Sequence, residues 1–361
     1  MINNTNDLTT RLIRAGITLN EPTYTAQLET PWFVRLLQAF SGWLAALFLL
    51  GFIAMGAVFV MENPIVSMGV GLAMVGAAFA LLRSASNDVV EHLALAISLA
   101  GQLLIAWAMV ELWETPVYPS WTLLGWSMLV LQSVLALIMP SLVHRTFSAF
   151  AACLALYVAL AESAIAAVVG GVVLLALTML WLNEFRWSGR IRDAQAWGYG
   201  LLIGLLVIQG LTHSDQPLWF DNHGAEVAGL ARWFNSALVA LSLALLGYVL
   251  QGYVFTRSKV HWSLYLSPVA LLLVELYVPG VGQGAVVLLL GVAIGHRVLV
   301  GLGGFSLLMG ISSYYYWLDA TLLTKALILL IMGGLLLALR WLLRRWLIAL
   351  KPSAKGAAHE E

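Results

Sequence analysis

The sequence has very few charged residues for its length. Only 10% of its 361 residues are Asp, Glu, Lys or Arg, whereas about a quarter of the residues in a typical soluble domain are charged. Hydrophobic residues make up 61% of the chain. A water-soluble domain of this size needs polar residues over its surface, so this composition excludes one and predicts an integral membrane protein in contact with the lipid bilayer.

Cysteine and catalytic motifs are also scarce. The single cysteine, Cys153, lies in an apolar run and is expected to be a buried thiol, which excludes a disulfide framework and a cysteine-based metal site. We find no Walker-type glycine-rich loop, no His-Glu-x-x-His and no Gly-x-Ser-x-Gly motif. The sequence therefore predicts no enzyme activity, no cofactor and no nucleic-acid partner.

Apolar runs long enough to cross a bilayer fill most of the chain. A helix needs about 20 apolar residues to span a hydrocarbon core of about 30 Å. The runs predict an all-α, polytopic transmembrane helix bundle of about twelve spans. They are expected at residues 35–60, 65–82, 91–113, 121–142, two within 146–182, 195–211, 230–254, 263–277, 284–296, 299–316 and 321–347.

Two places determine the number of spans. The run 146–182 is too long for one helix, and Glu162 with Ser163 predicts a tight turn between two spans. The short runs 263–277 and 284–296 flank a proline- and glycine-rich segment, residues 279–284, which predicts either a turn or a re-entrant break. Ten spans are the alternative, with both termini still on the same side.

Basic residues are distributed unevenly between the expected loops. When successive loops are assigned to alternate sides, one side receives 16 of the 18 Lys and Arg residues and the other keeps only Arg232 and Lys325. Lys and Arg stay in cytoplasmic loops, so this partition predicts an even number of spans with both termini in the cytoplasm, in a bacterial inner membrane. The expected organisation is a cytoplasmic segment with a short amphipathic helix (1–34), a transmembrane domain (35–347) and a cytoplasmic tail (348–361).

Small residues predict where helices approach one another. Gly, Ala and Ser spaced four residues apart let two transmembrane helices pack closely. Such spacing occurs at Gly69, Ala73 and Ala77, and at Gly291 with Gly295.

Ionisable residues near helix ends are candidates for function, because they are costly within a membrane. Glu111, Glu162, Glu275 and Asp319 are expected within about one turn of an outer helix end, where water or headgroups reach them. Lys325 lies four residues into the last expected span, and its long stem can reach outward. Pairing of Lys325 with Asp319 or Glu275 is either functional or structural.

Lys325 lies in the most polar stretch of the last spans, residues 312–325. Such a cluster can hold a small ligand, a lipid headgroup or a protein; alternatively, it is an aromatic belt with an N-cap for the last helix. The ligand or partner patch expected from the sequence consists of Tyr314, Tyr315, Tyr316, Asp319, Lys325 and Glu275.

Other polar groups allow further interpretations. The outer loop 212–229 is either a solvated acidic loop or a divalent-metal or partner surface, through His213, Asp215, Asp221, His223 and Glu226. A solute site would need polar side chains at mid-membrane, and the candidates are Gln102, Gln132, Ser133 and Gln209.

The last quarter of the chain contains Tyr314-Tyr315, Leu318 and Thr321-Leu322-Leu323-x-Lys325, with Gly333 or Gly334 downstream. Together with the segments 279–284 and 288–295, these residues resemble domain of unknown function 4401, an uncharacterised bacterial family of multi-pass membrane proteins. The resemblance implies an inner-membrane location, no assigned catalytic residue, and a possible partner, a small membrane-anchored periplasmic protein with a Gly-Asp-Tyr motif encoded beside such proteins.

Two functions from different classes are compatible with the sequence. The favoured one is a non-enzymatic membrane component that docks a periplasmic or membrane-anchored partner on the outer ends of the last helices. The alternative is a small-solute or lipid transporter, in which the segment 279–284 interrupts a helix to make a site.

Overall fold

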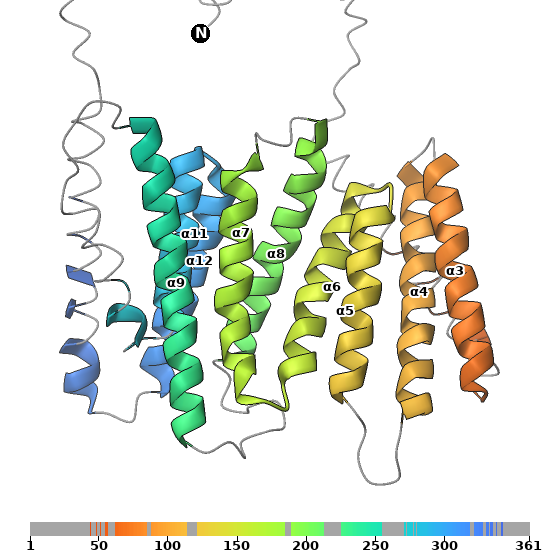
Figure 1. Ribbon diagram of the computed structural model, residues 1–361, viewed down its shortest axis with the longest axis horizontal. Helices are drawn as coiled ribbons and strands as arrows, with labels where there is room; N and C mark the ends of the chain where they lie inside the picture. Colours follow the sequence, from red (N-terminus) through yellow and green to blue (C-terminus); the bar gives the residue numbers. More distant parts are fainter. Residues whose placement is uncertain are drawn as a thin grey trace, which may run out of the picture.

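The computed structural model describes residues 62–84, 88–113, 121–184, 189–212, 225–254, most of 271–317, residues 321–327 and a few single positions outside these ranges. Within this part of the chain every regular element is a helix (Figure 1). Seven of these helices are long and apolar enough to cross a membrane. The chain is therefore an all-α, multi-pass membrane protein.

The helices follow the predicted spans closely, with ends that differ by a few residues. The expected spans 35–60, 263–277 and 321–347 lie wholly or mostly outside the described residues, so the total of twelve and the side of each terminus stay predictions. The helices are α3 (Pro64–Ser84), α4 (Asp88–Trp113), α5 (Trp121–Ile138), α6 (Leu142–Leu160), α7 (Val169–Leu182), α8 (Ile191–Thr212), α9 (Ala225–Val254), α11 (Val281–Ile294) and α12 (Arg297–Trp317), with a short 3-10 helix, η1 (Ala164–Val168), before α7.

The predicted turn at Glu162 is confirmed. Helix α6 ends at Leu160, the chain turns through residues 161–163, and η1 leads into α7. The Ser163 hydroxyl donates to the Leu160 carbonyl at 2.7 Å, and the Thr122 hydroxyl of α5 donates to the Glu162 carboxylate at 2.7 Å. The run 146–182 thus forms two antiparallel helices, as its length required.

The helices stand side by side in a row from α3 to α9, with α11 and α12 beside α7 and α9 (Figure 1). Their order in space departs from their order in the chain at one place. Helix α8 lies between α6 and α7, so α6 packs along α8 and barely touches α7. Large apolar side chains on the outer faces of this row, such as Val130 and Phe305, are exposed and suit contact with lipid.

Close helix approach occurs at glycines, only partly those that the sequence indicated. A Cβ added to Gly71 of α3 would lie 2.6 Å from the Gly101 carbonyl oxygen of α4. Gly69, Ala73 and Ala77 lie instead on the exposed face of α3. The expected span 35–60 lies almost wholly outside the described residues, so close approach at these three residues stays a prediction. A Cβ added to Gly291 would lie 2.6 Å from the Val300 nitrogen of α12, so these two helices do approach closely there, whereas Gly295 ends α11 with a φ of 75°.

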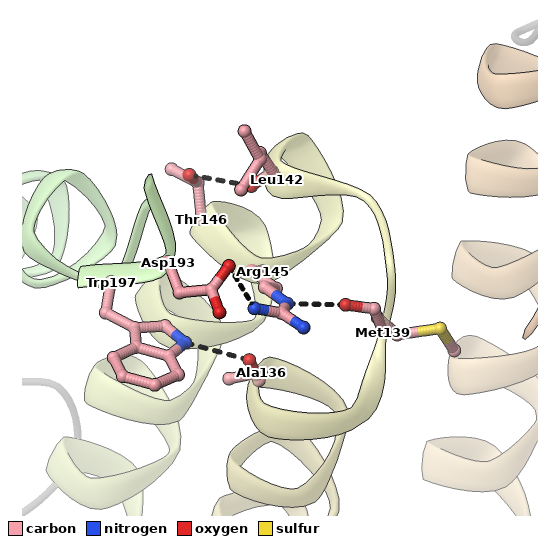
Figure 2. A network of polar contacts seen from close by, with 7 residues as sticks. All are labelled: Ala136, Met139, Leu142, Arg145, Thr146, Asp193 and Trp197. Carbon is pink, nitrogen blue, oxygen red and sulfur yellow. Dashed lines mark hydrogen bonds and ion pairs between the residues drawn. The ribbon is translucent and has the colours of Figure 1, made fainter. Parts of the chain in front are cut away.

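Helices α5, α6 and α8 are joined by polar contacts at one end (Figure 2). Pro140 has no N–H, so the Ala136 carbonyl, four residues earlier, cannot find its usual helical donor. The Trp197 indole Nε1 of α8 donates to that carbonyl at 2.8 Å. Arg145 Nε donates to the Met139 carbonyl, and its guanidinium also pairs with Asp193 of α8. These side chains of α6 and α8 thus satisfy the end of α5.

Two apolar clusters lie along the row. One joins α3, α4 and the end of α5, around Val75, Ala78 and Ile105. The larger one is formed by helices α6, α7, α8, α9, α11 and α12. It includes Cys153, which is buried as the sequence predicted. Because lipid is as apolar as these side chains, close packing and polar contacts, rather than removal of water, must hold the helices together.

Candidate functional site

Helix α11 begins well below the end of its neighbour α12. Its 14 residues extend over about 21 Å, less than the roughly 30 Å of a hydrocarbon core. A Cβ on Gly310 of α12 would lie 2.9 Å from the Gly280 carbonyl carbon, just before α11 starts. Gly310 is seven residues, or about 10 Å, short of the end of α12 at Trp317. The start of α11 therefore lies well below that end of the bundle.

Glu275 folds back onto the start of α11. Its Oε1 accepts a hydrogen bond from the Gly280 N–H at 3.0 Å, and its Oε2 accepts one from the Gly282 N–H at 2.7 Å. The chain can reverse here because Gly280 has a φ of 89°, which only glycine adopts without strain. Only 1% of the Glu275 surface is exposed. The carboxylate thus occupies the positive end of the α11 dipole, where free N–H groups bind anions.

Gln209 of α8 binds the same turn from the other side. Its side-chain Nε2 donates to the Gly280 carbonyl at 3.1 Å and to the Ser306 carbonyl of α12 at 3.0 Å. Its Oε1 accepts the Ser306 hydroxyl at 2.6 Å. One buried amide therefore ties α8, α12 and the start of α11 together.

Two further amides extend this group towards α7 and α9. Gln283, in the first turn of α11, lies against Gly170 of α7, and its Oε1 has no hydrogen-bond partner in the part of the chain described. The next residue, Gly171, donates its N–H to Asn235 Oδ1 of α9 at 2.8 Å. We call the group formed by Gln209, Asn235, Glu275, Gln283 and Ser306 the α11 polar layer.

The α11 polar layer changes the interpretation of two predicted residues. Gln209, a predicted solute-site candidate, lies within it. Glu275 was expected near water at a helix end, as Glu111 and Glu162 are, both of which are exposed. It is buried instead, because its carboxylate folds back onto the N–H groups of Gly280 and Gly282. Its described contacts are with α11 rather than with Lys325.

The predicted tyrosine patch is described only in part. Lys325 Nζ lies 5.3 Å from the centre of the Tyr315 ring, a distance typical of a cation–π contact. Tyr315 and Tyr316 are both exposed. Asp319 and the side chain of Tyr314 lie outside the described residues. The structure therefore brings Lys325 to Tyr315, and the rest of the patch stays a prediction.

A second buried polar group joins α4, α5 and α6. The Ser98 hydroxyl lies 2.7 Å from His144 Nε2, and the Ser148 hydroxyl lies 3.1 Å from His144 Nδ1. Gln132 Nε2 donates to Gln102 Oε1 at 2.8 Å, and Gln102 Nε2 donates to Ser98 at 3.0 Å. All five side chains are buried. None of these hydrogen bonds involves a charged side chain, as expected of neutral polar residues that link transmembrane helices.

The sequence signal for this second group was incomplete. Gln102 and Gln132 were predicted as polar residues at depth, but Ser133 is exposed on α5 and takes no part in the group. Ser98 with Gln102, and His144 with Ser148, are each four residues apart and so share a helix face. That spacing indicated two polar faces, but it did not reveal that they meet.

Metal coordination finds no support among the described residues, in which no three His, Cys, Asp or Glu side chains gather. Most of the loop 212–229, with His213, Asp215, Asp221 and His223, lies outside the described residues. Both predictions for it, a solvated acidic loop and a metal or partner surface, therefore stay untested.

Comparison with known proteins adds one finding. The family model described as Domain of unknown function (DUF4401) matches residues 31–346. The resemblance noted in the last quarter of the chain thus extends over nearly all of it. No curated protein and no solved structure matches the chain.

Proposed function

Since this chain belongs to the DUF4401 family and crosses the membrane several times, we propose that it is a non-enzymatic transporter of a small solute in a bacterial inner membrane. The α11 polar layer is the proposed solute site. This choice reverses the order of the two functions that the sequence allowed, because the buried groups offer more specific chemistry than the exposed patch.

One observation carries the proposal: a helix starts well below the end of its neighbour, with a buried carboxylate at its first N–H groups. Many transporters bind solutes where a discontinuous helix ends at mid-membrane, because its free backbone groups face the solute. A buried Glu and three buried amide or hydroxyl side chains are costly in a membrane interior. The unpartnered Gln283 Oε1 adds a hydrogen-bond acceptor that the described residues leave unused.

The test is whether water reaches the α11 polar layer. The only cysteine, Cys153, is first replaced by alanine, and Ser306→Cys is introduced. Ser306 is fully buried in the middle of α12. A membrane-impermeant methanethiosulfonate reagent, applied to each side of the membrane in turn, should label Ser306→Cys from at least one side.

Ser242→Cys is the matched control. Ser242 is as buried as Ser306, lies in the middle of α9, and bonds only to the Leu238 carbonyl of its own helix. It should stay unlabelled. If Ser306→Cys is no more reactive than Ser242→Cys from either side, no aqueous route reaches the layer and the transport proposal fails.

Partner docking remains the second candidate, and the exposed aromatic end of α12 favours it. Lys325 over the Tyr315 ring, beside exposed Tyr316, forms a compact cationic and aromatic surface. Aromatic side chains are enriched in protein interfaces. The proposed occupant is a small membrane-anchored periplasmic protein.

Docking predicts a stoichiometric partner that depends on this surface. Lys325→Ala and Asp319→Ala should lose a co-purifying protein in detergent, whereas Lys325→Arg should keep it, because Arg retains the cation–π contact. Membrane insertion, measured by protein yield in the membrane fraction, should not change. A wild-type protein that purifies alone would count against docking.

A further inference from the structure

We propose that the solute is a small anion, and that Glu275 is an internal occupant of its site which leaves the site on taking up a proton. The inference rests on the proposed transport function, since it assigns a solute class and a coupling ion to the same layer. It starts from the backbone N–H groups of Gly280 and Gly282, which bind the Glu275 carboxylate and which we call the anion seat.

That seat is built for a carboxylate. The N–H groups of Gly280 and Gly282 point at the two oxygens of Glu275, and the Gln283 N–H also interacts with them. All three belong to the turn that opens α11, where the helix dipole favours negative charge. Any small anion able to form two parallel hydrogen bonds would fit the same N–H groups once the side chain of Glu275 has left.

Protonation weakens the hydrogen bonds that hold Glu275 at the start of α11. The proton comes from water and binds one carboxylate oxygen, which neutralises the side chain and turns that oxygen into a donor. The protonated oxygen is a weaker acceptor for the N–H group that faces it, and only the carbonyl oxygen keeps its full acceptor strength. The new O–H group needs an acceptor. Gln283, a residue 94% buried in the same turn, lies against Gly170 of α7, and its Oε1 has no donor among the described residues.

The released N–H groups then need a new acceptor, because unpaired N–H groups are costly inside a membrane. An anionic solute supplies it. One proton and one negative charge enter together, so the loaded site carries the same net charge as the empty one. Loss of the proton returns the Glu275 carboxylate to its seat and displaces the solute.

The described surroundings leave Glu275 without an opposing charge. Val239 of α9 faces the Gly282 end of the seat, and Gln209 of α8 faces Gly280. The charged residues on these helices lie towards their ends: Glu226 and Arg232 near the start of α9, and Arg192 with Asp193 near the start of α8. The N–H groups, rather than a cation, therefore hold the carboxylate.

The experiment is chemical rescue of the whole chain in nanodiscs of phosphatidylcholine. Glu275→Ala empties the seat and should lower the unfolding temperature. Sodium formate, the smallest carboxylate, should refill the seat and raise the temperature of this variant by about 2 to 4 °C, the shift expected of one site in excess ligand. Formamide, its neutral counterpart, should have no effect.

A control variant and a wild-type measurement test whether formate binds at the start of α11. Glu184→Ala removes another buried carboxylate, one that accepts a hydrogen bond from the Gln195 side chain and from no backbone N–H among the described contacts, so formate should not rescue it. In the wild type, formate should stabilise the protein at mildly acidic pH and not at mildly alkaline pH. This wild-type arm remains decisive if Glu275→Ala does not fold.

The outcomes separate the two proposals. Formate with no effect on Glu275→Ala and none on the wild type at either pH overturns the anion seat, even when Ser306→Cys is labelled and transport stands. Equal rescue by formamide, or of Glu184→Ala, also overturns it, because filling of an empty space then explains the effect. Formate rescue without labelling of Ser306→Cys supports the anion seat and contradicts the transport proposal.

Discussion

At the scale of single residues, Gln209 satisfies several groups that no lipid could satisfy. In Gln209→Leu, the carbonyls of Gly280 and Ser306 and the Ser306 hydroxyl would lose this partner inside the membrane. We expect a loss of about 2 to 4 kcal/mol in the free energy of unfolding, since each buried unsatisfied group costs about 1 to 3 kcal/mol. Denaturant titration in detergent micelles measures it, with the exposed Ser133→Ala as a control that should not change.

Gly125 on α5 provides a second residue-scale prediction. A Cβ at this position would lie 2.3 Å from the Ala159 nitrogen of α6, so Gly125→Ala must push the two helices apart. Overpacking of this kind costs about 1 to 3 kcal/mol, which a thermal melt would detect. Gly76→Ala on α3 has no atom within 4 Å of the added Cβ and should be neutral or slightly stabilising. Equal melting temperatures for the two variants would contradict the close approach of α5 and α6.

At the scale of elements, the end of α5 depends on Trp197. Trp197→Phe removes the donor to the Ala136 carbonyl and should cost about 1 to 2 kcal/mol in a thermal or denaturant melt. Pro140→Ala restores a backbone N–H four residues after Ala136. The double variant should therefore recover part of the loss. If Pro140→Ala gives no recovery in the Trp197→Phe background, the missing N–H is not what makes Trp197 important.

Most elements could be predicted from the sequence, because a membrane requires long apolar runs with few exceptions. The turn at Glu162 followed from the length of the run 146–182 and from the polar pair Glu162-Ser163 within it. Helix faces were harder to assign. Lipid and protein interiors are equally apolar, so neither hydropathy nor small-residue spacing could decide which side of α3 meets α4. The contact of α3 with α4 at Gly71, rather than at the Gly69 stripe, could not be predicted for this reason.

The candidate site could be predicted only in its parts. Gln209 and the break at 279–284 were each recognised as unusual for a membrane span, since polar side chains and Pro-Gly segments are rare within apolar runs. Their meeting required knowledge that α8 lies beside α11 and α12, which no local pattern encodes. The depth of Glu275 depended on the direction in which the chain turns after it, and that direction follows from the positive φ of Gly280.

At the scale of the whole molecule, the partition of basic residues predicts which ends of the helices share a side. In the Cys153→Ala background, Asn63→Cys and Glu162→Cys should react with an impermeant maleimide added to the periplasmic side. Ser84→Cys and Arg190→Cys should react only after the membrane is opened. All four positions are exposed, so access should not limit the reaction. A reversed pattern would place the termini on the opposite side.

The position of α8 between α6 and α7 has a consequence for synthesis of the protein. The face of α6 that receives α8, including the backbone at Thr146 that lies against Gly200, is still uncovered when α7 leaves the ribosome. Helix α7 must therefore enter the bilayer without docking on its predecessor and leave room for its successor. A nascent chain that stops after α7 would present that face to lipid or to the insertion machinery, and assembly of the second half would begin only once α8 has crossed.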